Sequence, residues 1–193
     1  MQENRMYGEM LKVARAWLEG RQPEDIARKA NVAFDGANFR LESLGTAIVV
    51  SYPQYAITPE LTPWHQLLIL HYLHLADGMA LTGQKITFAG QKDGMVRGGG
   101  FDRKAEQALS RMSCDALKAR CAALGGRVIK SNADYSAQLP FLPMYPVFLN
   151  YWQADEDFPA SGRLLLDSSG SHYLTIEDSV VAGELILELL TEE

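Results

Sequence analysis

The segment from Trp64 to Ala76, WHQLLILHYLHLA, decides the architecture of this chain. Pro59 and Pro63 precede it and Asp77-Gly78 follows it, so these boundaries predict a single helix. Its apolar residues lie almost all round the helix: Trp64, Leu67, Leu68, Ile69, Leu70, Leu73 and Leu75. A helix that is apolar on every side must be surrounded by other elements. We therefore expect a buried helix at the centre of the protein.

Two helices are predicted before it. Residues 6–18 have apolar side chains near helical spacing, and Gly20 then ends the pattern. Pro23, followed by acids, opens a second helix that runs to Ala30. This N-terminal helical segment, residues 1–31, is expected to pack on the rest of the domain.

The residues between these helices and the central helix predict a hairpin. The pattern from Phe39 alternates, breaks at Leu44-Gly45 and resumes with the β-branched run Ile48-Val49-Val50. The second strand is expected to end at Pro53.

The rest of the chain alternates between strand and helix patterns. The expected elements are a strand at 85–90, a glycine-rich loop at 91–100, helices at 102–112 and 114–124, strands at 127–131, 146–153 and 162–169, a proline-marked connection at 139–146, and a helix from Thr175 to about Leu190. This order is neither a repeat nor strict βαβ alternation. It predicts an α+β fold with a mixed, mostly antiparallel sheet, built as a single domain over residues 1–193.

Composition narrows the function classes. The net charge of -6 argues against a nucleic-acid binder, which normally presents a basic face. The chain has no run of about 20 apolar residues and no secretory signal pattern, so we expect a soluble cytoplasmic protein that does not bind membranes. Cys114 and Cys121, seven residues apart, form neither a CxxC pair nor a disulfide framework.

Charge is unevenly distributed along the chain. Residues 151–193 hold ten acids and one base, whereas residues 1–150 hold 14 acids and 17 bases. The acidic C-terminal quarter either attracts a cationic partner or keeps the protein soluble.

The first candidate site is the segment Asp155-Glu156-Asp157-Phe158-Pro159. A metal or acid/base site here would need groups from elsewhere, such as His172 or Asp167. The alternative is that one acid caps a turn by accepting backbone N–H bonds while the others face water. In that case Phe158 and the proline would pack the loop onto the core.

The second candidate is the glycine-rich segment with its flanking bases. Gly98, Gly99 and Gly100 precede a predicted helix, and Arg97 and Arg103 add positive charge. Free backbone N–H groups at a helix start can hold a phosphate or carboxylate. The alternative is a flexible surface loop, since neither a Walker motif nor a dinucleotide fingerprint is present.

The histidines give weaker evidence for a functional site. His71 and His74 share one helix at a spacing of three, whereas histidine pairs that hold metals on a helix are more familiar at a spacing of four. Ordinary hydrogen-bonded histidines explain them better. His172 stands in SSGSHYL, but there is no GxSxG elbow for a nucleophilic serine. These histidines therefore predict no metal centre.

Three segments together resemble a known family. They are LLILHYLHLADGMALTGQKITFAG (67–90), FDRKAEQAL (101–109) and LPFLPMYPVFLNYWQADEDFPASGRLLLDSSGSHYLTIED (139–178). They are similar to the uncharacterised family catalogued as domain of unknown function number 3786, from anaerobic bacteria and archaea. The resemblance extends from about Leu41 to Leu190. It implies no established activity, but it implies an association with corrinoid and one-carbon metabolism. Some relatives carry an iron–sulfur segment, and this chain, with two cysteines, lacks a four-cysteine cluster of its own.

Taken together, the sequence favours an accessory module that binds a small anionic ligand or a corrinoid or redox protein. An enzyme with a carboxylate–histidine or metal site around the acidic segment is one alternative. A structural homodimer formed through an edge strand is another. No cofactor is specified by the sequence.

Overall fold

The computed structural model describes residues 2–192, with side chains from Met6 onward. Its helices are α1 (Gln2–Ala16), α2 (Pro23–Ala30), α3 (Pro63–Leu75), α4 (Arg97–Leu109), α5 (Cys114–Ala123) and α6 (Ile176–Thr191), with 3-10 turns η1 (Phe88–Gly90) and η2 (Gly170–His172). Its strands are β1 (Ala33–Phe34), β2 (Asn38–Ser43), β3 (Thr46–Ser51), β4 (Ile57–Thr58), β5 (Lys85–Ile86), β6 (Arg127–Val128), β7 (Tyr135–Leu142), β8 (Tyr145–Trp152) and β9 (Ser161–Asp167). The α+β class is confirmed.

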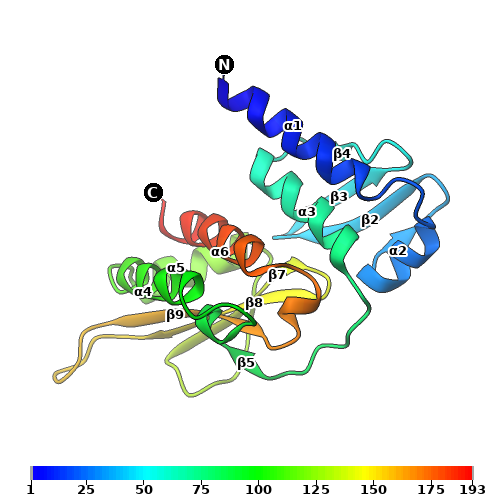
Figure 1. Ribbon diagram of the computed structural model, residues 1–193. Coiled ribbons are helices and arrows are strands. Elements are labelled where there is room, and N and C mark those ends of the chain that lie inside the picture. The colour runs from blue at the N-terminus through cyan, green and yellow to red at the C-terminus, as the bar shows by residue number, and fades with distance from the viewer. Residues whose placement is uncertain (1, 193) are drawn as a thin grey trace.

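The strands form two antiparallel sheets where the sequence predicted one. The first has the order β1-β2-β3-β4 and the second the order β5-β9-β8-β7-β6. Helices α4, α5 and α6 cover one face of the second sheet (Figure 1). The sheets meet where the Leu44 N–H donates to the Pro140 carbonyl at 2.8 Å. The four edge strands, β1, β4, β5 and β6, have two residues each.

The predicted hairpin is present as β2 and β3. Leu44 and Gly45 join the strands with φ values of 49° and 75°. Positive φ at both central residues belongs to the tight turn whose twist matches that of the flanking strands. The alternation then places Phe39 and Leu41 of β2 on the same buried face as Ile48 of β3.

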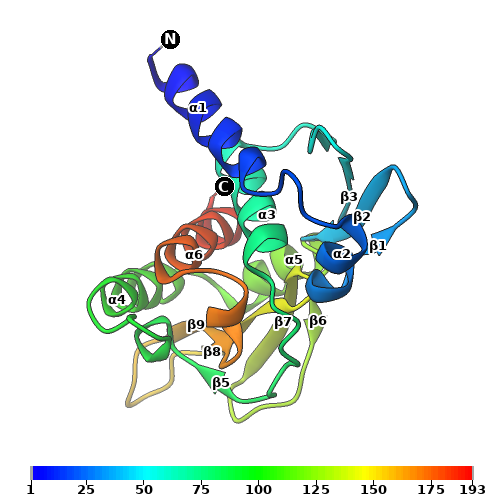
Figure 2. The same cartoon turned by 45° about the vertical axis from the view of Figure 1, so that its right-hand side comes forward.

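Helix α3 is the buried central helix that the sequence predicted. Every residue from Leu67 to Leu70 is buried, and so are Tyr72 and Leu73. Figure 2 shows α3 passing through the middle of the molecule, with α1 and α6 beside it. The Tyr72 hydroxyl donates to the Ala30 carbonyl at 2.5 Å and accepts from the Met144 N–H at 3.0 Å. One side chain therefore fixes α3 to both α2 and the β7–β8 turn.

The proline-marked segment 139–146 is a correction. We expected a connection before the strand at 146, but β7 continues through Pro140 to Leu142, and a two-residue turn leads into β8. Proline lacks an N–H and fits a strand at a bulge. The register shifts between Leu139 and Leu142, so Pro140 lies at such an irregularity, and its carbonyl bonds to the other sheet.

The expected strand at 85–90 is shorter than predicted. Only Lys85 and Ile86 pair with β9, and η1 follows. Thr87 caps this turn by accepting from the Gly90 N–H, and Asp102 accepts from the N–H groups of Phe88 and Ala89. Side-chain acceptors thus compete with the sheet for these backbone donors.

Helix α6 begins with a capping box at Thr175, the residue where the sequence placed its start. The Thr175 hydroxyl accepts from the Asp178 N–H, and the Asp178 carboxylate accepts from the Thr175 N–H.

Cys114 and Cys121 are free and buried. Among the helices that the structure describes, none has the length and apolar character that a membrane crossing requires.

Candidate functional site

The acidic segment forms the turn between β8 and β9. The Asp155 N–H donates to the Phe158 carbonyl at 3.0 Å, and Asp155 Oδ1 accepts from the N–H groups of Asp157 and Phe158 at 2.9 and 2.7 Å. Glu156 and Asp157 are exposed. One acid therefore caps the turn and the other two face water, which is one of the two arrangements that the sequence left open.

The acidic turn and His172 lie at opposite ends of β9. The turn precedes Ser161 and η2 follows Asp167, so seven strand residues, about 20 Å, separate them. An acid/base or metal site made from the turn and His172 needs these groups to converge. The structure does not bring them together.

Phe158 is a correction to the expected packing. We expected its ring to hold the loop on the core, but the residue is 71% exposed. The turn is closed by the hydrogen bonds of Asp155, so it does not need a buried anchor.

Phe158→Ala is accordingly expected to change the free energy of unfolding by no more than about 0.5 kcal/mol, because an exposed ring contributes little to folding. A buried phenylalanine would cost about 3–5 kcal/mol. Urea denaturation distinguishes the two values. A loss in the second range would contradict the exposed position of this ring.

The glycine-rich segment is a second correction. Gly98, Gly99 and Gly100 do not precede a helix; they form the first turn of α4. The N–H groups of Gly98 and Gly99 donate to the Gly94 carbonyl, and the Gly100 N–H donates to the Val96 carbonyl. These N–H groups are thus engaged within the chain and differ from the free donors that an anion site requires.

Close packing explains why glycine is required at two positions, Gly94 and Gly98. A Cβ on Gly98 would lie 2.3 Å from the Phe88 carbonyl carbon, and one on Gly94 would lie 2.2 Å from the Phe88 oxygen. A Cβ on Gly100 would meet nothing within 4 Å. Gly94 and Gly98 therefore allow η1 to touch the start of α4, whereas Gly100 has no such role.

The two arginines of this candidate anion site do not lie around one shared position. Arg97 Nε is 3.6 Å from a carboxylate oxygen of Glu177 on α6. Arg103 lines a small cavity of about 140 Å³ that it shares with Glu106 and Arg163. The glycines, Arg97 and Arg103 do not surround one anion.

His172 belongs to a clamp around the 77–84 loop. Its Nδ1 lies 2.6 Å from Asp77 Oδ2. The hydrogen bond from His172 holds the pKa of Asp77 below its ordinary value, and the Met79 N–H adds to this effect. The Tyr173 hydroxyl donates to the Met79 carbonyl. His172 therefore positions a loop.

Asp167 holds the other end of the same loop. It is 3% exposed and accepts from the N–H and hydroxyl of Thr82, from the Gly83 N–H, and from the N–H and hydroxyl of Ser169. Burial alone would raise the pKa of Asp167. The hydrogen bonds from Ser169 and Thr82 outweigh burial, so the pKa lies below its ordinary value. Four of these protein donors bond to Oδ1 and one bonds to Oδ2.

The helix α3 histidines have separate partners. His71 Nδ1 lies 2.8 Å from Asp178 of the capping box, and His74 Nδ1 lies 3.2 Å from the Trp17 carbonyl. Within residues 2–192, no three His, Cys, Asp or Glu side chains are grouped to hold a metal ion.

The third histidine of α3, His65, is buried. Its Nε2 lies 2.7 Å from the Ser43 hydroxyl, and its ring stacks on Phe141 at 5.6 Å between centroids. Burial disfavours the imidazolium and lowers the pKa of His65 to about 4.

This pKa predicts a specific acid sensitivity. In the unfolded chain the pKa of His65 lies near the ordinary histidine value of 6.5, but in the folded chain it is about 4. Stability is therefore lost as the pH falls below 6.5, by about 2 kcal/mol at pH 5. Urea unfolding at pH 7 and pH 5 measures it. The Ser43→Ala/His65→Leu variant should lose about 2 kcal/mol less over this range, and an equal loss would contradict the assignment.

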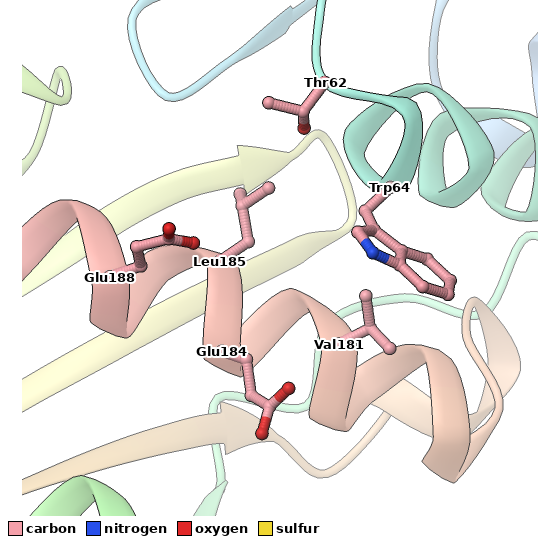
Figure 3. A pocket seen from close by; sticks show the side chains of 6 residues that line it. All are labelled: Thr62, Trp64, Val181, Glu184, Leu185 and Glu188. Carbon is pink, nitrogen blue, oxygen red and sulfur yellow. The ribbon is translucent and has the colours of Figure 1, made fainter. Parts of the chain in front are cut away.

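The sequence did not predict a groove between the start of α3 and the outer face of α6. The groove encloses about 410 Å³ and is lined by Thr62, Trp64, Val181, Glu184, Leu185 and Glu188. We call it the α3–α6 groove. In Figure 3, Trp64 lies over Val181, and Leu185 points toward Thr62.

The floor of the α3–α6 groove is apolar and rigidly held. Trp64 packs edge to face against Tyr7 of α1, with 5.1 Å between ring centroids. Val181 and Leu185 stand one turn apart on α6 and are half-buried. The folded core therefore leaves an indole and two aliphatic side chains accessible on one surface.

The wall of the α3–α6 groove is acidic. Glu184 and Glu188 stand one turn apart on α6, and Glu184 pairs with Lys104 of α4 at 2.8 Å. Glu188 lies beside Glu192, and its hydrogen bond and like charge raise the pKa of Glu192. Negative charge is thus in excess at this end of α6, where the helix dipole is also negative.

The comparisons with known proteins identify the family alone. No curated protein and no solved structure matches the chain. A family model described as "Domain of unknown function (DUF3786)" matches residues 22–188, which include α3 and most of α6. This match confirms the resemblance found in the sequence, and the chain belongs to the family that shares this domain of unknown function.

Proposed function

We propose that this protein is a single-domain accessory module that binds a partner protein, and that the α3–α6 groove receives a basic amphipathic helix of that partner. The observation that carries the proposal is the pairing of an apolar floor, Trp64, Val181 and Leu185, with the carboxylates of Glu184 and Glu188. Helix-binding grooves take the apolar face of a helix on such a floor. Basic residues at the rim of that helix would then meet the acids.

The charge of the chain supports a cationic occupant. Residues 151–193 hold ten acids and one base, and they include all of α6. Opposite charges at a rim increase the association rate and exclude acidic competitors. A second copy of this chain would present the same acidic α6. The two-residue edge strands also offer little backbone for pairing between copies.

Catalysis is less well supported than binding. A carboxylate–histidine site around the acidic turn required His172 nearby, and β9 lies between them. The chain's resemblance to its family directs the search for the partner toward corrinoid and redox proteins of anaerobic one-carbon metabolism. We place this interaction in the cytoplasm.

Titration with two designed helical peptides tests the groove. One peptide carries leucine on one face and lysine on the other; the second replaces each lysine with glutamate. We expect the lysine peptide to bind more tightly by at least about tenfold at low salt, since rim charges are screened only weakly there. Calorimetry measures both affinities.

Matched substitutions locate the binding. Glu188→Lys is expected to weaken binding of the lysine peptide by about fivefold or more. Glu156→Lys makes the same charge change on the β8–β9 turn and should have less than half that effect on the affinity. Leu185→Glu should weaken binding of the lysine peptide by at least about tenfold. Val128→Glu changes an apolar position of β6 that is 74% exposed and should leave this affinity unchanged. Equal effects of both members of either pair would contradict the proposed groove.

A further inference from the structure

A second pocket lies at the far end of the molecule, at the tip of the β8–β9 hairpin. It encloses about 440 Å³ and is lined by Asp134, Trp152, Gln153, Asp155, Phe158, Pro159 and Ser161. We call it the tip pocket. Its residues come from the end of β8, the acidic turn and the residue before β7. The hairpin tip extends away from α3 and α6 (Figure 1), so the tip pocket is separate from the α3–α6 groove.

The tip pocket has aromatic walls. The half-buried Trp152 forms one side, and Phe158, which is 71% exposed, forms another. An exposed phenylalanine at the end of a hairpin does not contribute to the core. The Trp152 ring already attracts a cation, because the Arg163 guanidinium lies 6.0 Å from its centroid.

The tip pocket also has two fixed carboxylates. Asp134 Oδ2 accepts from the Gln153 N–H at 2.8 Å, and Asp155 Oδ1 accepts from the N–H groups of the turn. These bonds hold each carboxylate in place through one of its oxygens. Within the described part of the chain no hydrogen bond involves the second oxygen of each, Asp134 Oδ1 and Asp155 Oδ2, so its negative charge can lie against a cationic ligand.

Aromatic faces and carboxylates together select one kind of ligand. Aromatic rings attract organic cations through their π faces, and quaternary ammonium ligands are recognised by cages of such rings. A hard metal ion would require a shell of oxygen ligands, which the rings of Trp152 and Phe158 cannot supply. An anion would be repelled by Asp134 and Asp155.

We propose that the tip pocket binds an alkylammonium group. Trp152 and Phe158 enclose the group, and Asp134 and Asp155 balance its charge. The group comes either from a free amine or from a lysine side chain of a protein. The three acids that dominate the sequence of this turn thus have different roles: Asp155 shapes the turn and faces the ligand, while Glu156 and Asp157 make the surroundings acidic.

The test follows the indole N–H resonance of Trp152 in the ¹⁵N-labelled protein while choline is added. A saturable shift is expected. The neutral isostere 3,3-dimethylbutan-1-ol has the same shape without the charge and should bind at least about tenfold more weakly. Phe158→Ala and Asp134→Asn should each weaken choline binding by about fivefold.

Two controls and a second ligand complete the experiment. Asp157→Asn removes an acid of the same turn that does not line the pocket, and Glu188→Lys alters the α3–α6 groove; both should bind choline as the unmodified protein does. N-acetyl-lysine methylamide, compared with choline, shows which source is preferred, and tighter binding of either ligand supports the proposal. No saturable shift up to about 50 mM of either ligand, or equal binding of the neutral isostere, would overturn it.

Discussion

Replacing Gly98 with alanine is expected to lower the free energy of unfolding by at least about 3 kcal/mol, the upper range for overpacking a filled site. The added Cβ would lie 2.3 Å from the carbonyl carbon and oxygen of Phe88 and 2.6 Å from the Ala89 nitrogen. All three atoms belong to the backbone of η1. A side-chain rotation cannot relieve the contact, so η1 or the start of α4 must move. Urea denaturation at neutral pH measures the loss.

Gly100→Ala provides the matched control two residues later in the same helix. Its Cβ would meet no atom within 4 Å. Alanine has the higher helix propensity, so this variant should be more stable than the unmodified protein by up to about 1 kcal/mol. Similar changes at both positions would show that residues 97–100 form a loop, as the sequence first indicated, and would contradict the helix.

Asp167→Ala is expected to lower the free energy of unfolding by about 3 kcal/mol, because it leaves the buried Ser169 N–H and two partly buried N–H groups of the 77–84 loop without an acceptor. The backbone N–H groups of Thr82, Gly83 and Ser169 all bond to this carboxylate. The loop at 77–84 would lose its attachment to the end of β9. Chemical denaturation gives the total, and hydrogen exchange at Thr82 and Gly83 locates the opening.

Asp167 also makes the free energy of unfolding fall as the pH is lowered. Its pKa is depressed in the folded protein, so its contribution is present above the unfolded pKa and is lost as the pH falls through the folded value. The exposed Glu156→Gln serves as the control and should change stability by less than about 0.5 kcal/mol. A loss below about 1 kcal/mol in Asp167→Ala would contradict the clamp.

Sequence patterns correctly predicted the central helix and the β2–β3 hairpin, whose structure depends on residues that are close together in the sequence. The apolar run at 67–70 identified the central helix because no surface helix tolerates apolar residues on every side. The hairpin at Leu44-Gly45 followed from alternation and a glycine that permits positive φ. In both cases the residues that determine the structure are neighbours in the sequence.

Contacts that the folded chain makes, or does not make, explain the errors. Gly94 and Gly98 suggested a loop, but their small size serves the contact between η1 and α4. Pro140 suggested a break, but its carbonyl bonds to Leu44 of the other sheet. Phe158 suggested an anchor because aromatic residues are usually buried, yet it is exposed. The sequence alone shows none of these partners.

The α3–α6 groove was missed for the same reason. Trp64 and Leu185 are 121 residues apart, and each fits an ordinary helix pattern. One signal was present: Val181 and Leu185 alternate with Glu184 and Glu188 along α6, so apolar and acidic residues stand side by side on one helix face. Only the packing of α3 against α6 shows that these residues line a groove.

Binding of a basic helix in the α3–α6 groove is tested by a map of amide and indole chemical-shift changes on addition of the lysine-bearing helical peptide. We expect the largest changes at the lining residues Trp64, Val181, Leu185 and Glu188, and none in the β1–β4 sheet. The glutamate-bearing peptide, added at the same concentration, should cause much smaller changes at these residues. Changes that avoid both sides of the α3–α6 groove, or equal changes with both peptides, would contradict a groove that selects a basic partner.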